Sequence, residues 1–565
     1  MAKKILLIII IFQAVSYSLS AQTMPIGTPA LDDYYRRQQL LNYGDSLTSF
    51  TVRPIFNTNN ADLKSKFYPD SSDKKLDKSY SFSQFNFGKG FTAVLLPLSI
   101  QTQFNSDHPY GWNDGAMIPA KGLQTLVSAG IYAKFGILSV QFKPEFISAA
   151  NDQFETLNKN HYDTFVARYY DFYNNIDLPV RFGTKSYTKA YWGQSSIRLT
   201  YNSFSLGLST ENLWWGPGIR NSLLMSNSAP GFKHITINTV KPIKTPIGSF
   251  EGQFIAGRLE NSGYGPLEPD STHLYFGNPL YVPKSKDWRY ISGIVVTWQP
   301  KWVSGLFLGL ASSSQLYSKD LGSFGNYFPF FSPVKKITTD VPINQPDRRS
   351  SLFMRWVLPQ EQAEFYFEYG TSNSTNDLRN LLLQPQDARA YVFGMRKFVP
   401  FNKERNENIL ISLEVTQLAE TSPDKIYAGQ EWYVNSYIRQ GYTNNGQLLG
   451  AGIGPGANSQ TLDVSWVKGL KRLGIQFERY IHNDDFYIYT FSDNYDWRRH
   501  WVDLSISLNG EWNYKNLIFN AKIQSISSLN YQYYIDPKTP VEGTYYQKGL
   551  SASNIQLQAG LTYRF

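Results

Sequence analysis

Polar and apolar residues alternate along much of the chain, and the last twelve residues show the pattern most clearly. From Asn554 to Phe565 every second residue is apolar, and the residues between them are polar or glycine. Successive side chains of a β-strand point to opposite faces, so this alternation predicts a strand with one apolar and one polar face. About ten residues with one apolar face form the repeating unit of a transmembrane β-barrel.

The same pattern recurs in about 18 segments, an even number that suits a single-chain barrel. Some neighbours are joined by short turns, such as Gly136 and Gly469, and others by long polar loops. Short turns at one end and long loops at the other are typical of outer-membrane barrels. The predicted strands are 92–105, 123–135, 138–148, 195–201, 204–210, 235–240, 248–260, 291–299, 306–315, 352–358, 363–369, 390–398, 409–417, 461–468, 470–481, 501–512, 517–531 and 555–565.

The first 21 residues have the order of a secretory signal peptide. Lys3 and Lys4 precede an apolar run at 5–12, and small and polar residues follow up to Ala21. The run is too short for a membrane helix, so we expect cleavage after Ala21 or, alternatively, after Ser20. The chain has no cysteine, which excludes a lipid-anchored cysteine, disulfides and thiol chemistry.

Residues 22–45 are predicted to contain a short helix. Thr28 can cap its start, Pro29 suits the first turn, and Gly44 can end it. We expect this segment to cover the periplasmic mouth of a barrel formed by residues 46–565. A helix packed loosely on the outside is the alternative.

Composition agrees with a membrane barrel and adds a charge. Aromatic residues make up 16% of the chain, as girdles at both membrane interfaces require. The formal net charge is +9. A basic protein suits anionic outer-membrane lipid or acidic glycans as partners, although solvated loops explain the charge equally well.

The alternation also predicts which charged residues face the lumen. In 363–370, Glu364, Tyr366 and Glu368 share the inward face, and Arg355 points inward on the preceding strand. Arg389 lies nearby in sequence. Opposite charges in one lumen favour ion pairs that brace the barrel. The alternative is that Arg355, Glu368 or Arg389 hydrogen-bonds a sugar.

The densest group of chemically distinctive residues is Glu211-Asn-Leu-Trp-Trp-Gly-Pro-Gly-Ile-Arg220, followed by Ser226-Asn-Ser-Ala-Pro-Gly231. Pro217 donates no backbone hydrogen bond, so this segment is a bend and not a regular strand. It gathers the rings of Trp214 and Trp215 with the charges of Glu211 and Arg220. Sugar rings stack on such aromatic faces, and planar charged groups bind uronic carboxylates. A buried turn that plugs or braces the barrel is the alternative.

This segment resembles the signature of the Wzi capsule-assembly family. Ser228 departs from the pattern, because a second Asn is expected there, and this leaves the hydrogen bonding of the turn open. The resemblance extends from about Leu31 to Phe565. Five further blocks carry it, namely Tyr110–Ala116, Leu352–Trp356, Leu381–Pro385 with Ala388–Tyr391, Gly441–Thr443 with Leu449–Gly450, and Ile453–Gly456.

The resemblance implies an all-β fold, a transmembrane antiparallel barrel of about 18 strands with a small helical piece at the periplasmic mouth. It also implies an outer-membrane lectin that binds capsular polysaccharide or exopolysaccharide, with capsule export machinery as a further partner, and no catalysis, cofactor or nucleic acid. A porin-like channel for oligosaccharides or polar solutes remains the alternative function. The candidate polysaccharide-binding residues are Glu211, Trp214, Trp215, Arg220, Asn227, Arg355, Glu368, Arg389 and Tyr442.

Enzymatic motifs are weak by comparison. None of the six histidines has metal-ligand spacing. The Gly452-x-Gly454-x-x-Ala457 pattern lacks the strand and helix that a dinucleotide site needs. Glu364 and Glu368 could be drawn as a glycosidase pair, but lumen ion pairing is the commoner role of such residues.

Overall fold

The structure is a computed structural model. It describes residues 23–26, 29–43, 45–56, 67, 69, 84–87, 90–156, 163–266, 274–275, 278–322, 324–328, 346–372, 389–420, 431–491, 500–534 and 551–565. The expected signal peptide and the 381–385 block therefore lie outside the described residues. Within them, every helix is too short or too polar to span a bilayer.

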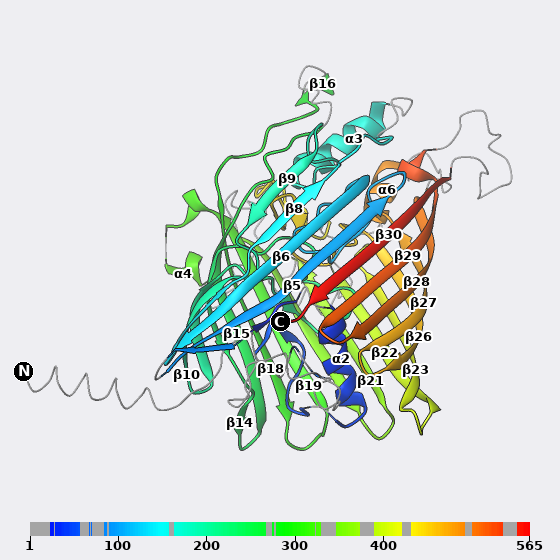
Figure 1. Cartoon of the computed structure of the whole chain (residues 1–565). Coiled ribbons are helices and arrows are strands. Elements are labelled where there is room, and N and C mark those ends of the chain that lie inside the picture. Colours follow the sequence, from blue (N-terminus) through cyan, green and yellow to red (C-terminus); the bar gives the residue numbers. More distant parts are fainter. Residues whose placement is uncertain are drawn as a thin grey trace, which may run out of the picture.

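The chain forms a closed antiparallel β-barrel of 18 wall strands (Figure 1). Each wall strand pairs with its neighbours in chain order, and the last, β30, pairs with the first, β5, to close the ring. Three wall strands consist of two collinear segments, namely β7 with β8, β9 with β10, and β13 with β14. A further short strand, β4 (Gln84–Phe87), pairs with the first residues of β5.

The wall segments are β5 (Phe91–Asn105), β6 (Gly122–Phe135), β7 (Leu138–Phe142), β8 (Glu145–Ala149), β9 (Tyr187–Tyr191), β10 (Ser196–Tyr201), β11 (Phe204–Ser209), β13 (His234–Thr239), β14 (Ile243–Thr245), β15 (Gly248–Leu259), β18 (Arg289–Pro300), β19 (Leu306–Tyr317), β20 (Asp347–Leu358), β21 (Ala363–Ser372), β22 (Arg389–Asn402), β23 (Glu407–Gln417), β26 (Asn458–Lys468), β27 (Lys471–Ile481), β28 (Val502–Tyr514), β29 (Leu517–Leu529) and β30 (Ala552–Tyr563).

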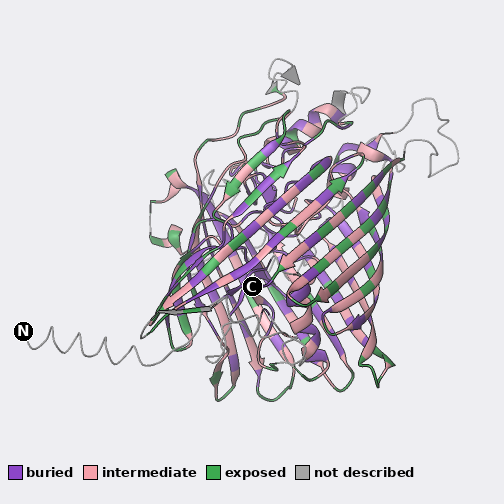
Figure 2. Cartoon of the chain, viewed as in Figure 1, coloured by how far each residue is buried: buried purple, intermediate pink, exposed green. Residues whose placement is uncertain are grey.

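Burial alternates along the wall strands as the sequence pattern predicts (Figure 2). In β30, Ile555 and Leu557 are exposed on the outer face, whereas Asn554 and Gln556 are buried on the inner face. An outer band of exposed apolar side chains around a closed barrel is the surface that a lipid bilayer covers. The protein therefore has the wall of a membrane-spanning barrel.

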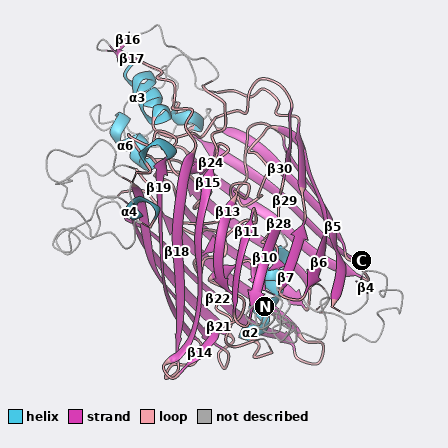
Figure 3. Ribbon diagram, turned by 90° about the vertical axis from the view of Figure 1, so that its left-hand side faces the viewer, coloured by secondary structure: helices cyan, strands magenta, loops and turns pink. Residues whose placement is uncertain are grey.

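The two ends of the barrel differ. Short turns such as the one at Gly469 lie at one end, which is the periplasmic end in barrels of this type. Long connections lie at the other end, where the helices α3 (Asp163–Asn174) and α6 (Asp484–Phe491) pack together (Figures 1 and 3). Phe165 of α3 meets Phe486 of α6 edge to face at 5.7 Å.

The barrel interior is filled by segments of the chain. Helix α2 (Pro29–Leu40) lies inside the short-turn end (Figure 1). Residues 210–233, between β11 and β13, and residues 431–457, between β23 and β26, supply much of the largest buried apolar cluster. The short inner strands are β1 (Thr23–Met24), β2 (Val52–Arg53), β3 (Ile55–Phe56), β12 (Trp214–Trp215), β24 (Thr443–Asn444) and β25 (Gln447–Leu448).

All 18 predicted strands correspond to wall strands, and the predicted N-terminal helix is α2. Helices α3 and α6 were not predicted, because they lie in stretches that look like long polar loops. The upper segment β9 was also missed. The division into units at residues 21 and 45 stays a prediction.

Candidate functional site

The segment with the adjacent tryptophans leaves the wall after β11 and crosses the barrel interior before it returns at β13. Its first residue, Glu211, is buried among polar partners. Arg198 donates a hydrogen bond to the Glu211 carboxylate at 2.6 Å, and Ser209 donates at 2.9 Å. Burial alone would raise the pKa of Glu211, but the Arg198 charge and the hydrogen bonds lower it below its ordinary value. Thr23, from the N-terminal segment, also donates to Glu211.

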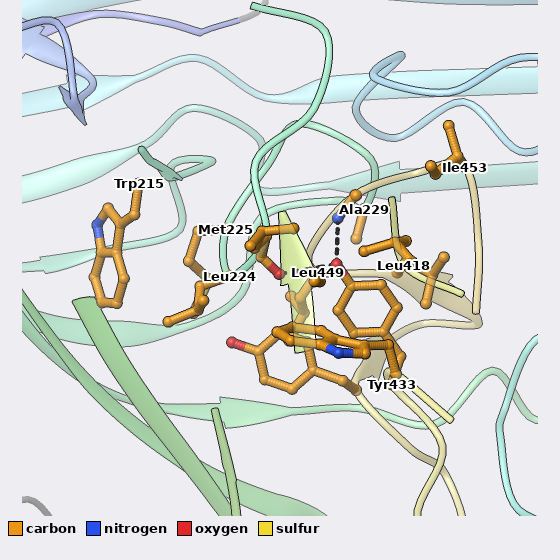
Figure 4. Close-up of a cluster of buried hydrophobic side chains, with 14 of the residues drawn as sticks. Trp215, Leu224, Met225, Ala229, Leu418, Tyr433, Leu449 and Ile453 are labelled. Carbon is orange, nitrogen blue, oxygen red and sulfur yellow. Dashed lines mark hydrogen bonds between the residues drawn. The ribbon is translucent and has the colours of Figure 1, made fainter. Parts of the chain in front are cut away.

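The two indoles pack inside the barrel and do not face solvent. Their strand, β12, pairs with β2 of the N-terminal segment. The ring of Trp214 lies 4.4 Å from the guanidinium of Arg53. Trp215 is fully buried, and its ring nitrogen donates to Gln253 at 2.9 Å. Figure 4 shows Trp215 at the edge of the buried cluster that includes Leu224 and Tyr433.

The Gly-Pro-Gly bend receives the N-terminal segment through its backbone. The amide of Gly216 donates to the carbonyl of Thr51 at 2.9 Å. Arg36 of α2 donates to the carbonyl of Pro217 at 2.7 Å, and Arg53 donates to that of Gly218 at 3.3 Å. Together with the β2–β12 pairing, these contacts make the bend a socket for residues 23–56.

The other side of the bend is held by carboxylates of the wall. The backbone amides of Ile219, Arg220 and Asn221 all donate to Glu414 of β23. The Arg220 guanidinium donates to Glu478 of β27 at 2.9 Å, and its side chain is 26% exposed. One buried carboxylate that accepts three successive amides fixes the turn in place, because leaving such amides unpaired would be costly.

Asn227 holds the end of the crossing segment. Its amide donates to the carbonyl of Asn113 at 2.9 Å, and its oxygen accepts from Asn212 at 2.6 Å. The neighbouring Ser228 donates to the Asn113 side chain at 3.0 Å. Asn227 also lines a polar cavity of about 30 Å³, beside Lys143 and others, with room for about two water molecules.

A network of ion pairs ties α2 to the wall. Glu364 of β21 lies 2.6 Å from Arg355, 2.9 Å from Arg36 and 3.6 Å from Arg396. Asp33 of α2 pairs with Arg396 and with Arg37, the latter at 2.6 Å. The predicted bracing of the lumen by ion pairs is therefore confirmed, and so is the inward orientation of Arg355, Glu364 and Glu368.

Among the remaining candidate residues, the carboxylate of Glu368 lies close to Gly216 of the bend. Glu368 is fully buried and accepts the backbone amide of Leu223 at 3.3 Å. The Tyr442 hydroxyl lies 2.7 Å from that of Ser313, and its ring lies 4.6 Å from the guanidinium of Arg349. Arg389, at the start of β22, is half-buried.

Glu211, Trp214, Trp215 and Arg220 lie on one segment but have separate partners, since Glu211 pairs with Arg198 of β10 and Arg220 pairs with Glu478 of β27. They do not form an exposed surface in common with Arg355, Glu368, Arg389 and Tyr442. Direct contact of these residues with a polysaccharide stays a prediction. Sequence reasoning missed Arg36, Arg53 and Glu414, whose only signal was charge near the helix or on the inner face of a strand.

Comparison with known proteins identifies the family of the chain. The family described as capsule assembly protein Wzi matches residues 120–516. The chain belongs to the Wzi capsule-assembly family. The resemblance seen in the sequence is therefore confirmed, and the fold is that of a membrane-spanning β-barrel.

Solved structures match the chain at low identity. One is Wzi of Escherichia coli, an outer membrane protein involved in group 1 capsule assembly that is described as a carbohydrate-binding β-barrel. It is 11% identical, has a TM-score of 0.58, and the match covers 97% of this chain and 100% of that one. OccAB2 of Acinetobacter baumannii (10% identical, TM-score 0.37) and OprD of Pseudomonas aeruginosa (9%, 0.37) each match over 83% of this chain and over 98% and 94% of their own. A search of curated protein sequences finds no match.

In this Wzi-family chain, the signature bend serves as the socket of the N-terminal segment. Among the described residues, no three His, Cys, Asp or Glu side chains gather as a metal site requires. The chemistry that the interior offers is hydrogen bonding and ion pairing.

Proposed function

We propose that this protein is an outer-membrane lectin that binds capsular polysaccharide or exopolysaccharide and helps to attach or organise it at the cell surface. Membership of the Wzi capsule-assembly family carries the proposal. The fold shared with the carbohydrate-binding barrel of Escherichia coli supports it. The excess of basic residues suits an acidic glycan, because opposite charges attract the two partners over a distance.

The filled lumen disfavours the alternative of a porin-like channel. Helix α2, the crossing segment 210–233 and the segment 431–457 occupy the interior, and ion pairs hold α2 to the wall. A conduit for oligosaccharides would need these segments to leave. A static lectin role needs no such movement.

A deletion strain tests the proposal. We expect cells without the gene to synthesise the polysaccharide in normal total amount but to release it into the medium, and a plasmid copy to restore the cell-attached layer. The measurement is uronic-acid content in washed cells and in the supernatant. An unchanged cell-attached layer would contradict a role in capsule organisation, and a fall in total polysaccharide would indicate a role in synthesis or export instead.

The lack of catalysis, and contacts with export machinery or with specific lipid, remain part of this proposal. Purified protein incubated with the isolated polysaccharide should leave its chain length unchanged on size-exclusion chromatography. Shortened chains would show that the protein cleaves the polysaccharide.

A further inference from the structure

The barrel wall is interrupted on its long-loop side. Segment β9 pairs with β8 along one edge, and no strand of the described chain pairs with its other edge. Its continuation β10 does have a partner there, because β11 pairs with β10 up to Ser209. Beyond Ser209 the chain turns into the interior, and it rejoins the wall at His234 of β13. At the level of β9, no strand therefore lies between β9 and the end of β15 at Leu259 in the described chain. We call this interruption of the barrel wall the wall notch.

An inner hairpin spans the wall notch. The tip of the β24–β25 hairpin lies between the two sides, because the amide of Asn445 donates to the carbonyl of Glu260 at 2.9 Å. On the other side, Lys189 of β9 donates to the Asn445 side chain at 2.7 Å. Figure 3 shows β24 at the level of the upper end of β15. Interior chain is thus presented at the side of the barrel.

The β9 side of the wall notch carries two lysines and a tyrosine ring. Lys189 and Tyr191 lie opposite Ile147 and Glu145, whose side chains are buried, so they point to the inner face of the wall. Both nevertheless remain partly exposed, which follows from the missing neighbour strand. The Lys189 ammonium lies 4.9 Å from the ring of Tyr191. Lys185, two residues before β9, is exposed.

The opposite side also carries cations, but Arg258 points to the outer face, since it alternates with the buried Ile255 and Leu259 of β15. Arg258 is 48% exposed and lies 5.0 Å from the ring of Trp288. Lys233 is exposed, and its carbonyl accepts the amide of Arg258 at 2.9 Å. Tyr264 is 37% exposed and packs edge to face on Phe182. Glu260 is the acidic residue of this side, and it is already paired with Arg258 at 2.7 Å.

We propose that the wall notch is a binding site for an acidic polysaccharide, formed by Lys185, Lys189, Tyr191, Lys233, Arg258 and Tyr264. The inference rests on the proposed lectin function and names the site and the ligand class. Cations bind uronic carboxylates, and exposed tyrosine rings stack on sugar rings. The unpaired edge of β9 adds backbone groups that sugar hydroxyls can hydrogen-bond. A lipid headgroup would use the cations but would leave the rings and the strand edge without a partner.

Binding by the full-length protein in lipid nanodiscs tests the site. The probes are alginate, which is acidic, and dextran of similar length, which is neutral. We expect wild type to bind alginate and not dextran, and Lys189→Gln with Arg258→Gln to weaken alginate binding about tenfold, since two charge-assisted contacts are lost. The matched control is Lys471→Gln, because Lys471 also lies over an aromatic ring, Trp512 at 4.3 Å, but at the short-turn end. Its binding should equal that of wild type.

A protection experiment does not depend on the stability of the double variant. The chain has no cysteine, so a single one at Lys185 reports on the wall notch alone. Alginate should slow maleimide labelling of Lys185→Cys about tenfold or more when the site is saturated, and should leave labelling of Lys403→Cys, in a turn at the other end, unchanged. Equal labelling of Lys185→Cys with and without bound alginate would overturn the proposal.

The outcomes separate the site from the function. If wild type binds the cells' own isolated polysaccharide and the double variant binds both polysaccharides equally well, the wall notch is not the site and the lectin function stands. If wild type binds neither the cells' own polysaccharide nor alginate, the lectin function fails and the site with it. If the double variant keeps alginate binding but co-purifies with less lipopolysaccharide, the surface binds lipid headgroups and the proposal is overturned.

Discussion

Glu364 is a carboxylate inside the barrel that forms several ion pairs. Three guanidiniums converge on it, those of Arg36, Arg355 and Arg396, and two of these come from the wall and one from α2. All four side chains are buried. A buried guanidinium without a counter-charge costs free energy, and so does a buried carboxylate. Glu364 and the arginines therefore compensate each other's charge.

Glu364→Gln should therefore destabilise the barrel by about 3–5 kcal/mol, because it leaves buried positive charge uncompensated. The measurement is urea unfolding in detergent micelles, followed by tryptophan fluorescence. Glu361→Gln is the matched control, since Glu361 is 73% exposed and lies 3.9 Å from Lys397. A loss under 1 kcal/mol for Glu364→Gln would show that water reaches the cluster.

Asp33 gives the docking of α2 a dependence on pH. Burial would raise the pKa of Asp33, but the charges of Arg396, Arg37 and Arg472 lower it well below its ordinary value of 3.8. A lowered carboxyl pKa contributes stability above the ordinary value, and the contribution is lost as the pH falls below it. We expect hydrogen exchange of α2 amides to be slow, after correction for intrinsic rates, from pH 7 to pH 5, and to speed up below about pH 4.

Asp33→Asn should remove this dependence and leave α2 less protected already at pH 7. The amides of α3 provide the internal control, since Asp33 does not contact that helix. Faster exchange of α2 in wild type between pH 7 and pH 5 would contradict the role of Asp33.

At the scale of elements, the signature bend connects the N-terminal segment to the wall. Residues 23–56 touch it through β2, Thr51 and Arg36, and the wall touches it through Glu414 and Gln253. The rings of Trp214 and Trp215 lie within this joint. This position explains why both tryptophan rings are buried although they precede a Gly-Pro-Gly turn.

Trp215→Ala should cost about 3–5 kcal/mol, because it empties a fully buried indole site. Urea unfolding in micelles measures the loss, and Trp302→Ala is the control, since Trp302 is 70% exposed. The same variants distinguish support from direct glycan contact. A Trp215→Ala protein with normal stability and weakened polysaccharide binding would favour contact.

At the scale of the whole molecule, the wall could be predicted from the sequence, whereas of the interior only α2 and the ion pairs of the lumen could. Alternation with a period of two is a local signal, so Ile555, Gln556, Arg355 and Glu364 were assigned to their faces correctly. The interior segments show no such period, since they are irregular and bury residues on all sides. The pairing of β2 with β12 joins residues more than 150 positions apart, and no local pattern reports it. The wall notch likewise depends on where two strands end.

The filled interior predicts that wild-type protein conducts no steady current in planar bilayers, because α2, the crossing segment and residues 431–457 occupy the lumen in succession. Asp33→Asn with Arg36→Ala weakens the docking of α2 and removes one hydrogen bond to the crossing segment, from Arg36 to the carbonyl of Pro217. We expect this variant to stay closed as well, since the crossing segment remains bound to Glu414 by three backbone amides. A porin prepared in the same way serves as the positive control. Steady opening of the variant alone would assign closure to α2, and steady opening of wild type would restore the channel as a function.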